Sequence, residues 1–339
     1  MAGCLVDSVI WIITGICNLN CKHCYAYKWR GKPELPLDEK LRLVREFAEC
    51  NIEYVNISGG EPIMHPHTRR ILEELSNYGI ETSIVTNGTL LTREWSRFLA
   101  KHNIFVFVSL DGPKHVHDLQ RGRGTYERVV EGLSLLREEG AAFATIMAVS
   151  KLNWRYTREF VDLSVQLGST RPILIPVMPF GKALENRIYI DAKEYWQAVL
   201  SAASRAKELG VKLQLWCSPF AYSALPPSLR DVVEISFCRT APVIDIDPQG
   251  NVLLCDVMDI KLDNVVGKKL REVVERVENH PLVREIFAPK DLPPQCRECP
   301  YSWQCRGGCF ARALFKYGSL NAGDPLCPLR SGLAAASKI

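Results

Sequence analysis

Strand-like and helix-like segments alternate along the first two-thirds of this 339-residue chain, and no other feature constrains its fold as strongly. The run from Phe105 to Leu110 is continuously apolar, as expected for a strand buried on both faces. The stretch 38–50 has helical spacing, with Val44 and Phe47 on one face. We expect strands at residues 8–14, 53–57, 82–85, 105–110, 144–149 and 172–177. Strands that alternate with helices predict an α/β fold with a parallel sheet, here a partial (β/α)6 barrel of the TIM type.

The character of the sequence changes near Cys238, where cysteines become dense and proline and glycine punctuate short segments. Pro219, Pro226 and Pro227 indicate a loop just before this change. A chain of this length also exceeds one comfortable hydrophobic core. We therefore predict a core domain over residues 1–217, a linker over residues 218–237 and a smaller cysteine-rich domain over residues 238–339.

Charge and hydropathy exclude several classes of partner. The net charge is +4 with no basic tract, which argues against a nucleic-acid partner. No apolar run approaches the roughly 20 residues that span a bilayer, and Asp7 interrupts the first apolar stretch, so we expect neither a membrane span nor a secretory signal. The expected compartment is the cytoplasm. There, 13 cysteines indicate metal ligands rather than disulfides, with a disulfide-rich hyperthermophile protein as the alternative.

The first cysteine set is Cys17, Cys21 and Cys24, spaced C-x3-C-x2-C directly after the first expected strand. In β/α barrels, the loop at the carboxyl end of a strand carries the active site. Three thiolates bind three irons of a [4Fe–4S] cluster and leave the fourth iron open to an exogenous ligand. A zinc site completed by His23 is one alternative, although zinc sites favour C-x2-C pairs. A redox dithiol is another, and it would use only Cys21 and Cys24.

Residues 17–25, of sequence CNLNCKHCY, resemble the cysteine loop of radical S-adenosylmethionine (SAM) enzymes. His23 stands where many of those enzymes carry an aromatic residue. The run Gly59, Gly60, Glu61, Pro62 follows the second expected strand and is similar to the GGEP motif of the same superfamily. The resemblance implies that this run contacts the methionine amino group of SAM. In isolation the run could be an ordinary turn.

Two further expected strands end in polar residues, where a barrel presents its ligand contacts. Asn87 follows the third expected strand, and Ser109 lies near the end of the fourth. The same resemblance implies that Ser109 bonds the ribose of SAM and that Arg121 binds its carboxylate. Asp111 and Gly112 could instead form a tight turn.

A second cysteine set lies in the last third of the chain and comprises Cys238, Cys255, Cys296, Cys299, Cys305, Cys309 and Cys327. Its spacing resembles the SPASM domain, which binds two auxiliary [4Fe–4S] clusters. The resemblance implies that Cys238, Cys255 and Cys309 hold the first auxiliary cluster, and that Cys296, Cys299, Cys305 and Cys327 hold the second. The fourth ligand of the first cluster is either Cys217 or an open position. A pair of zinc ribbons is the alternative, and Cys4 and Cys50 read as core residues.

The resemblance implies three [4Fe–4S] clusters, SAM and a low-potential electron donor of the ferredoxin or flavodoxin type. Reductive cleavage of SAM would then give a 5′-deoxyadenosyl radical that abstracts a hydrogen atom from the substrate. Asp256 directly follows Cys255. We expect it to act as a general base if burial raises its pKa, and otherwise to be a turn aspartate.

The substrate implied first is a peptide or protein side chain, which the enzyme would oxidise or cross-link. Because 16 residues precede Cys17, a leader-guided enzyme would need a separate recognition partner. A tetrapyrrole or another small molecule is the second candidate, since residues 305–313 are similar to haem-branch enzymes. Arg312 could then meet a propionate, although a solvated helix charge is its more ordinary role. A non-enzymatic electron carrier is the third candidate.

Overall fold

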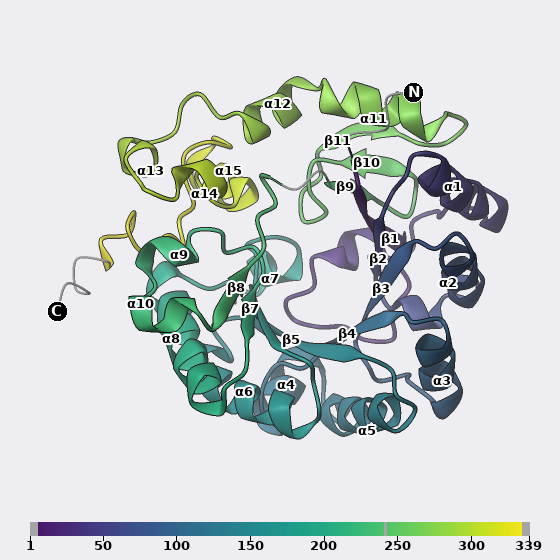
Figure 1. The fold of residues 1–339 in the computed structure, drawn as a ribbon, viewed down its shortest axis with the longest axis horizontal. Coiled ribbons are helices and arrows are strands. Elements are labelled where there is room, and N and C mark those ends of the chain that lie inside the picture. The colour runs from purple at the N-terminus through teal and green to yellow at the C-terminus, as the bar shows by residue number, and fades with distance from the viewer. Residues whose placement is uncertain (1–5, 241–242, 334–339) are drawn as a thin grey trace.

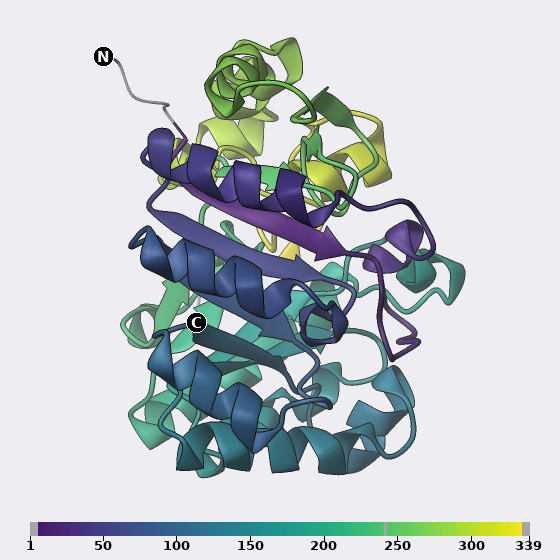
Figure 2. The same cartoon turned by 90° about the vertical axis from the view of Figure 1, so that its right-hand side faces the viewer.

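The computed structural model describes residues 6–240 and 243–333, and Figures 1 and 2 show their arrangement. Eleven strands form one sheet in the order β11-β10-β9-β1-β2-β3-β4-β5-β6-β7-β8. The strands are β1 (Ser8–Thr14), β2 (Tyr54–Gly59), β3 (Glu81–Thr86), β4 (Phe105–Ser109), β5 (Phe143–Val149), β6 (Pro172–Pro176), β7 (Leu213–Leu215), β8 (Val233–Ile235), β9 (Val243–Ile246), β10 (Asn251–Leu253) and β11 (Lys261–Asn264).

The pairing from β9 through β1 to β8 is parallel throughout, and β10 is antiparallel to both of its neighbours, β9 and β11. Figure 1 shows that the sheet curves and that most of the helices surround its outer side. The expected α/β fold of the barrel type is confirmed, and all six expected strands are present within a few residues of their expected bounds. Three more parallel strands, β7, β8 and β9, extend the sheet beyond the six repeats.

Each of the first six strands is followed by one or more helices. The helices are α1 (Leu37–Glu49), α2 (Thr68–Asn77), α3 (Arg93–Lys101), α4 (Lys114–Arg121), α5 (Thr125–Glu138), α6 (Thr157–Gln166), α7 (Lys182–Glu185), α8 (Ala192–Leu209), α9 (Ala221–Ala224), α10 (Pro227–Arg230), α11 (Leu270–Glu278), α12 (Pro281–Phe287), α13 (Pro294–Arg297), α14 (Ser302–Cys305) and α15 (Phe310–Tyr317), with 3-10 turns η1 (Ala26–Trp29), η2 (Pro62–Met64) and η3 (Trp154–Tyr156).

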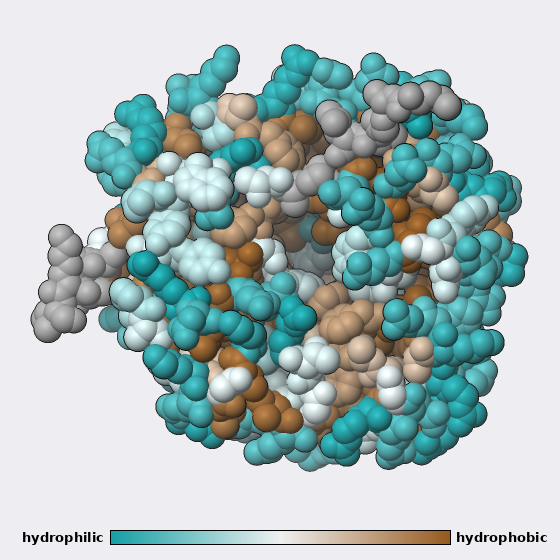
Figure 3. Space-filling view, in the orientation of Figure 1, coloured by the Kyte–Doolittle hydropathy of each residue, from teal (hydrophilic) through white to brown (hydrophobic). Residues whose placement is uncertain are grey.

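Local sequence explains where these helices begin and which face they bury. Thr92 caps α3 by accepting a hydrogen bond from Trp95 N. In α2, Ile71, Leu72 and Leu75 share the buried face. Figure 3 shows hydrophilic residues around the rim of the molecule, while hydrophobic residues gather toward its hollowed centre. No helix in the described part of the chain is long and apolar enough to cross a membrane.

The main hydrophobic core joins the first two-thirds of the chain to the cysteine-rich part. Its members include Trp11 and Phe47, whose rings meet edge to face at 5.4 Å, and also Ile246 and Val273. Residues 218–237, expected as a linker, hold α9, α10 and β8, and β9 beyond them pairs directly with β1. Cys50 is 3% exposed in the same core. Cys4 lies outside the described residues.

Candidate active site

The first cysteine set lies on the loop between β1 and η1, and we call residues 15–25 the cysteine loop. Its backbone is held from two sides: Lys22 N donates to Gln120 O at 2.9 Å, and Cys24 O accepts from Lys182 N at 3.1 Å. The three thiols interact electrostatically with one another. Burial raises the pKa of Cys21 to about 12 and also raises the pKa values of the other two. Three largely buried thiols that interact electrostatically therefore lie on one loop.

Gly59 and Gly60 let the end of β2 approach the cysteine loop. Gly60 N donates to Thr14 O at 2.8 Å. A Cβ on Gly60 would lie 2.2 Å from Ile16 O, and one on Gly59, at φ 142°, would lie 2.4 Å from Thr14 O. Real Cβ atoms do not approach this closely, so both positions require glycine. In this structure, therefore, the backbone of Gly59 and Gly60 lies close to the backbone of residues 14–16.

Glu61 is fully buried, and its carboxylate accepts three hydrogen bonds from the chain. The donors are Thr86 Oγ1 at 2.7 Å, Asn87 N at 2.7 Å and Ile63 N at 3.2 Å. Burial raises its pKa to about 7, and these hydrogen bonds oppose the rise. The carboxylate thus ties the end of β2 to the end of β3. Pro62, which opens η2, is also buried.

Asn87 and Ser109 lie at the same edge of the sheet as the cysteine loop. Asn87 Nδ2 donates to Asn18 Oδ1 at 2.9 Å, and Asn87 Oδ1 accepts from Thr89 N at 2.9 Å. The Asn87 amide therefore holds the cysteine loop through Asn18. Ser109, the last residue of β4, is 9% exposed.

Arg121 ends α4, a helix that sequence analysis did not predict. Its Nε donates to Asp111 Oδ2 at 2.6 Å, and both residues are buried. Gln120 Nε2 and Ala148 N also donate to this carboxylate, at 2.7 and 2.9 Å. Burial alone would raise the pKa of Asp111, but the charge and hydrogen bond of Arg121 act together with His23 and His117 and lower the pKa to about 2. In this structure the guanidinium expected to meet SAM faces a carboxylate of its own chain.

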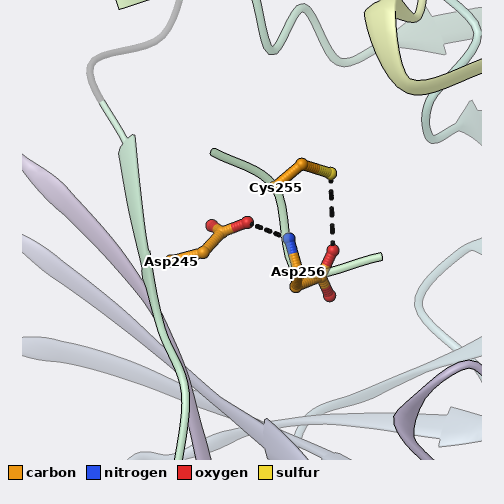
Figure 4. Close-up of side chains that lie close together, drawn as sticks. All are labelled: Asp245, Cys255 and Asp256. Carbon is orange, nitrogen blue, oxygen red and sulfur yellow. Dashed lines mark hydrogen bonds between the residues drawn. The ribbon is translucent and has the colours of Figure 1, made fainter. Parts of the chain in front are cut away.

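Asp256 lies against the cysteine loop from the far end of the sequence. Tyr25, directly after Cys24, donates from its hydroxyl to Asp256 Oδ2 at 2.5 Å. Figure 4 shows two further contacts: Cys255 Sγ lies 3.7 Å from Asp256 Oδ1, and Asp256 N donates to Asp245 Oδ2 at 2.7 Å. Burial raises the pKa of Asp256, and burial together with the Asp256 charge raises that of Asp245.

Lys28 fixes the segment that carries Asp256. Its Nζ donates to the backbone oxygens of Asp256 and Met258, each at 2.8 Å, and lies 3.1 Å from Asp259 Oδ1. Because Lys28 belongs to η1, the turn that follows the cysteine loop is bound directly to the loop that follows Cys255. The two cysteine regions therefore meet at this point.

Cys217 lies with the cysteines expected to hold the first auxiliary cluster. Cys217, Cys238, Cys255 and Cys309 share one apolar cluster. The largest electrostatic partners of Cys217 are Cys309 and Cys238. Its backbone has φ 53°, in the left-handed region that costs a non-glycine residue energy and that is enriched at functional sites.

The four cysteines expected to hold the second auxiliary cluster line one cavity. The lining includes Cys296, Cys299, Cys305 and Cys327, together with Arg330. Arg330 Nη1 is buried and has no hydrogen-bond partner among the described residues, and its charge lowers the pKa of Cys296 against the effect of burial. A buried donor beside four thiols suits an anionic group in this cavity.

The interpretation of Arg312 as a solvated helix charge is wrong. Its side chain is 2% exposed, and its Nη2 lies 2.6 Å from Asp324 Oδ2. The same nitrogen donates to Cys217 O at 2.6 Å. Helix α15 faces the interior at this position, so the charge is buried and paired.

Residues 11–164 match the family model described as the Radical SAM superfamily. This part of the chain belongs to the radical SAM superfamily. The match runs from β1 into α6, so it includes the cysteine loop, the glycines at the end of β2 and the Asp111–Arg121 pair. The expectation that the chain is a radical SAM enzyme is confirmed, and membership implies one [4Fe–4S] cluster and SAM.

Relatives extend the similarity to nearly the whole chain. The AdoMet-dependent heme synthase of Methanosarcina barkeri is 27% identical over 348 residues, which cover 96% of this chain and 97% of that protein. Mycofactocin maturase MftC of Mycolicibacterium smegmatis is 28% identical over 344 residues, which cover 97% of this chain and 84% of MftC. Among solved structures, Streptococcus suis SuiB bound to precursor peptide SuiA has a TM-score of 0.78 at 18% identity, covering 96% of this chain and 76% of SuiB. That likeness shows the fold alone.

The thiols of the radical SAM domain fit the cluster that the superfamily implies. Cys17, Cys21 and Cys24 are not joined in disulfides, and they supply three thiolates from one loop. Metal binding displaces the protons of thiols, including thiols whose pKa is raised. The positive charge of the bound iron would therefore stabilise the three thiolates in this buried site.

Sequence reasoning assigned no role to Tyr25, Lys28 or Asp245, and it did not pair Asp111 with Arg121. One signal was available for Asp245, because a carboxylate interrupts the apolar strand β9. Tyr25 had no signal beyond its place after Cys24, since its partner Asp256 lies 231 residues away.

Proposed function

We propose that this chain is a radical SAM maturase that oxidises or cross-links a side chain of a peptide or protein. Cys17, Cys21 and Cys24 would hold the SAM-binding cluster. When bound, the cluster and SAM supply a 5′-deoxyadenosyl radical that removes a hydrogen atom from the substrate. The observation that carries the proposal is the 2.5 Å contact between Tyr25 and Asp256, which holds a carboxylate beside the cysteine loop.

The chain's own residues divide the remaining work. Asp256 would accept a proton from the substrate at a carboxylate oxygen, as a general base positioned by Tyr25 and Lys28. Gly59, Gly60, Glu61, Pro62 and Asn87 would hold the SAM-binding edge in place. Ser109 and Arg121 would contact SAM, with Arg121 oriented by its bond to Asp111.

The cysteine-rich region would bind two auxiliary [4Fe–4S] clusters in a SPASM-type domain, predicted to begin near residue 238. We propose that Cys238, Cys255, Cys309 and Cys217 hold the first, which makes Cys217 the fourth ligand. Cys296, Cys299, Cys305 and Cys327 would hold the second. The shared apolar cluster and the common cavity support these two sets. A ferredoxin or flavodoxin in the cytoplasm would supply electrons.

A tetrapyrrole substrate is the second candidate. It is supported by the heme synthase of Methanosarcina barkeri, which matches this chain over nearly its full length. Arg312, the side chain expected to meet a propionate, is instead paired with Asp324. The structure therefore supplies no propionate contact at that position.

The first test is production of 5′-deoxyadenosine by anaerobically reconstituted, reduced protein supplied with SAM. We expect this nucleoside from the natural sequence and none from Cys21→Ala. Asp256→Asn should still form it but yield at least about 100-fold less product from the true substrate, because only proton removal is impaired. Stimulation by a peptide supports the maturase, whereas stimulation by a propionate-bearing tetrapyrrole supports the second candidate. Fully loaded protein that forms none with any reductant or substrate would contradict both.

The ligand sets are tested by counting iron and sulfide per chain. We expect Cys217→Ser to weaken or lose one auxiliary cluster, while Cys50→Ser, which changes a core cysteine, should keep all three. Equal cluster content in the two variants would exclude Cys217 as a ligand.

A further inference from the structure

Arg239, directly after Cys238, is a fully buried arginine whose hydrogen bonds all go to neutral acceptors. Its side chain is 1% exposed. Its Nε donates to Gly308 O at 2.8 Å and its Nη2 to Leu320 O at 2.6 Å. Its Nη1 donates to Asn321 Oδ1 at 3.0 Å and to Ile286 O at 3.4 Å. Each of its three nitrogens thus donates at least one hydrogen bond, but none of these bonds goes to a carboxylate of the described residues.

The positive charge of Arg239 has no carboxylate partner among the described residues. Asp324 is the carboxylate that acts on Arg239 electrostatically, but both of its oxygens accept hydrogen bonds from Arg312, at 2.6 and 3.0 Å. Asn321 relays one contact to Glu285 Oε1 at 3.1 Å, but Glu285 is exposed to solvent. Every Asp and Glu side chain lies within the described residues, and none of them forms an ion pair with Arg239.

A buried guanidinium of this kind needs a counter-charge, because arginine stays protonated in proteins and an unpaired buried charge is strongly unfavourable. The groups that interact with it most strongly are Cys238, Cys309 and Cys305. The first two belong to the set proposed for the first auxiliary cluster, and Cys305 belongs to the second set. As thiolates holding iron clusters, both sets would carry net negative charge.

We infer that Arg239 is a fixed counter-charge shared by the two auxiliary clusters and that it raises their reduction potentials. The inference rests on the auxiliary clusters of the proposed function. Reduction adds an electron to a cluster, and a positive charge held nearby in a poorly solvated interior favours the more negative state. Net charge, hydrogen bonding and burial are the means by which a protein sets iron–sulfur potentials, and Arg239 supplies the first.

The test is a potentiometric titration of the auxiliary clusters, followed by electron paramagnetic resonance, in a chain whose three cysteine-loop thiols are replaced by alanine. We expect Arg239→Met to make the auxiliary clusters at least tenfold harder to reduce, which is ~59 mV for one electron. Arg239→Lys keeps the charge and should stay close to the parent. Arg297→Met is the matched control, because Arg297 lies between Cys296 and Cys299 but is exposed, so solvent screens its charge.

Two results would overturn the inference: equal shifts in Arg239→Met and Arg297→Met, or the same shift in Arg239→Lys as in Arg239→Met. If Arg239→Met fails to keep its clusters, iron and sulfide content replaces the potential as the readout. If Arg239→Lys keeps its clusters and Arg239→Gln does not, the result supports a requirement for positive charge at this position. If Arg239→Lys also loses its clusters, the inference is overturned. Iron counting on the parent comes first, since a parent without auxiliary clusters refutes the proposed function itself.

Discussion

Asp111 illustrates how one buried carboxylate organises several elements near the cysteine loop. It accepts hydrogen bonds from Arg121 and Gln120 of α4 and from Ala148 of β5, so it joins the end of β4 to both. The backbone oxygen of Arg121 in turn lies 4.0 Å from Cys21 Sγ. From sequence, Asp111 and Gly112 could form a tight turn. Gly112 has φ 105° in the structure, a conformation that favours glycine.

At the residue scale, we predict that Asp111→Asn destabilises the protein by about 3 kcal/mol, because it leaves the Arg121 charge buried without a partner. The measurement is urea unfolding of the anaerobic protein. Glu208→Gln is the control, since it breaks the exposed pair with Arg158 and should cost much less. Equal losses in the two variants would show that Arg121 does not depend on Asp111.

At the scale of elements, a group of charged side chains joins α1 to the loops on either side of the active site. Lys40 of α1 is 1% exposed, and its Nζ lies 3.0 Å from His65 Nε2 and 3.7 Å from Glu34 Oε2. Glu34 Oε1 accepts from Gly15 N and Thr14 Oγ1, each at 2.8 Å. The base of the cysteine loop is thereby tied to the residue after η2.

This group has a defined pH dependence. Burial would raise the pKa of Glu34, but hydrogen bonds from His65, Gly15 and Thr14 hold it at about 2, below the ordinary 4.5. Since the folded pKa is the lower one, ionised Glu34 stabilises the fold above pH 4.5. That contribution is lost as the pH falls through about 2.

We predict that Lys40→Met costs about 2 kcal/mol of unfolding free energy, because Glu34 and His65 lose a charged partner. The double variant Lys40→Met/Glu34→Gln should recover part of the loss, since it removes both charges. Both are read from urea midpoints. Lys101→Met, on the exposed last turn of α3, should stay within about 0.5 kcal/mol. Strictly additive single losses would rule out an interaction between Lys40 and Glu34.

At the scale of the whole molecule, the cysteine-rich region completes the sheet of the radical SAM domain. β9 pairs in parallel with β1, matching Ser8 to Val243. Arg42 of α1 donates to Val265 O at 2.8 Å, and Glu46 accepts from Leu270 N at the start of α11. These contacts cover an edge of β1 that would otherwise expose unpaired backbone groups.

We therefore predict that a chain of residues 1–237 does not unfold cooperatively and associates in solution. Circular dichroism in urea and size-exclusion chromatography would check this. Residues 238–339 supplied as a second chain should restore a cooperative transition, because they return β9 and α11. A sharp, monomeric transition for residues 1–237 alone would instead show that the predicted core domain folds independently.

Much of the fold was predictable from sequence because its helices and strands depend on patterns of residues that are close together in the chain. The alternation of strands and helices depends on apolar periodicity, and the cap of α3 at Thr92 depends on residues next to it in the chain. The C-x3-C-x2-C spacing places three thiols on one loop whatever the rest of the chain does. The glycines at 59 and 60 were also visible, although the group they approach was not.

Tertiary structure alone decided how charges and polar groups pair. Nothing local indicates that Arg121 faces Asp111, that Arg312 is buried against Asp324, or that Tyr25 meets Asp256. Such partners are fixed by the order of strands in the sheet, which brings together residues far apart in the chain. Sequence therefore determined which chemical groups this radical SAM enzyme carries and on which loops, and the packing of the sheet determined which of them meet and which charges lie buried.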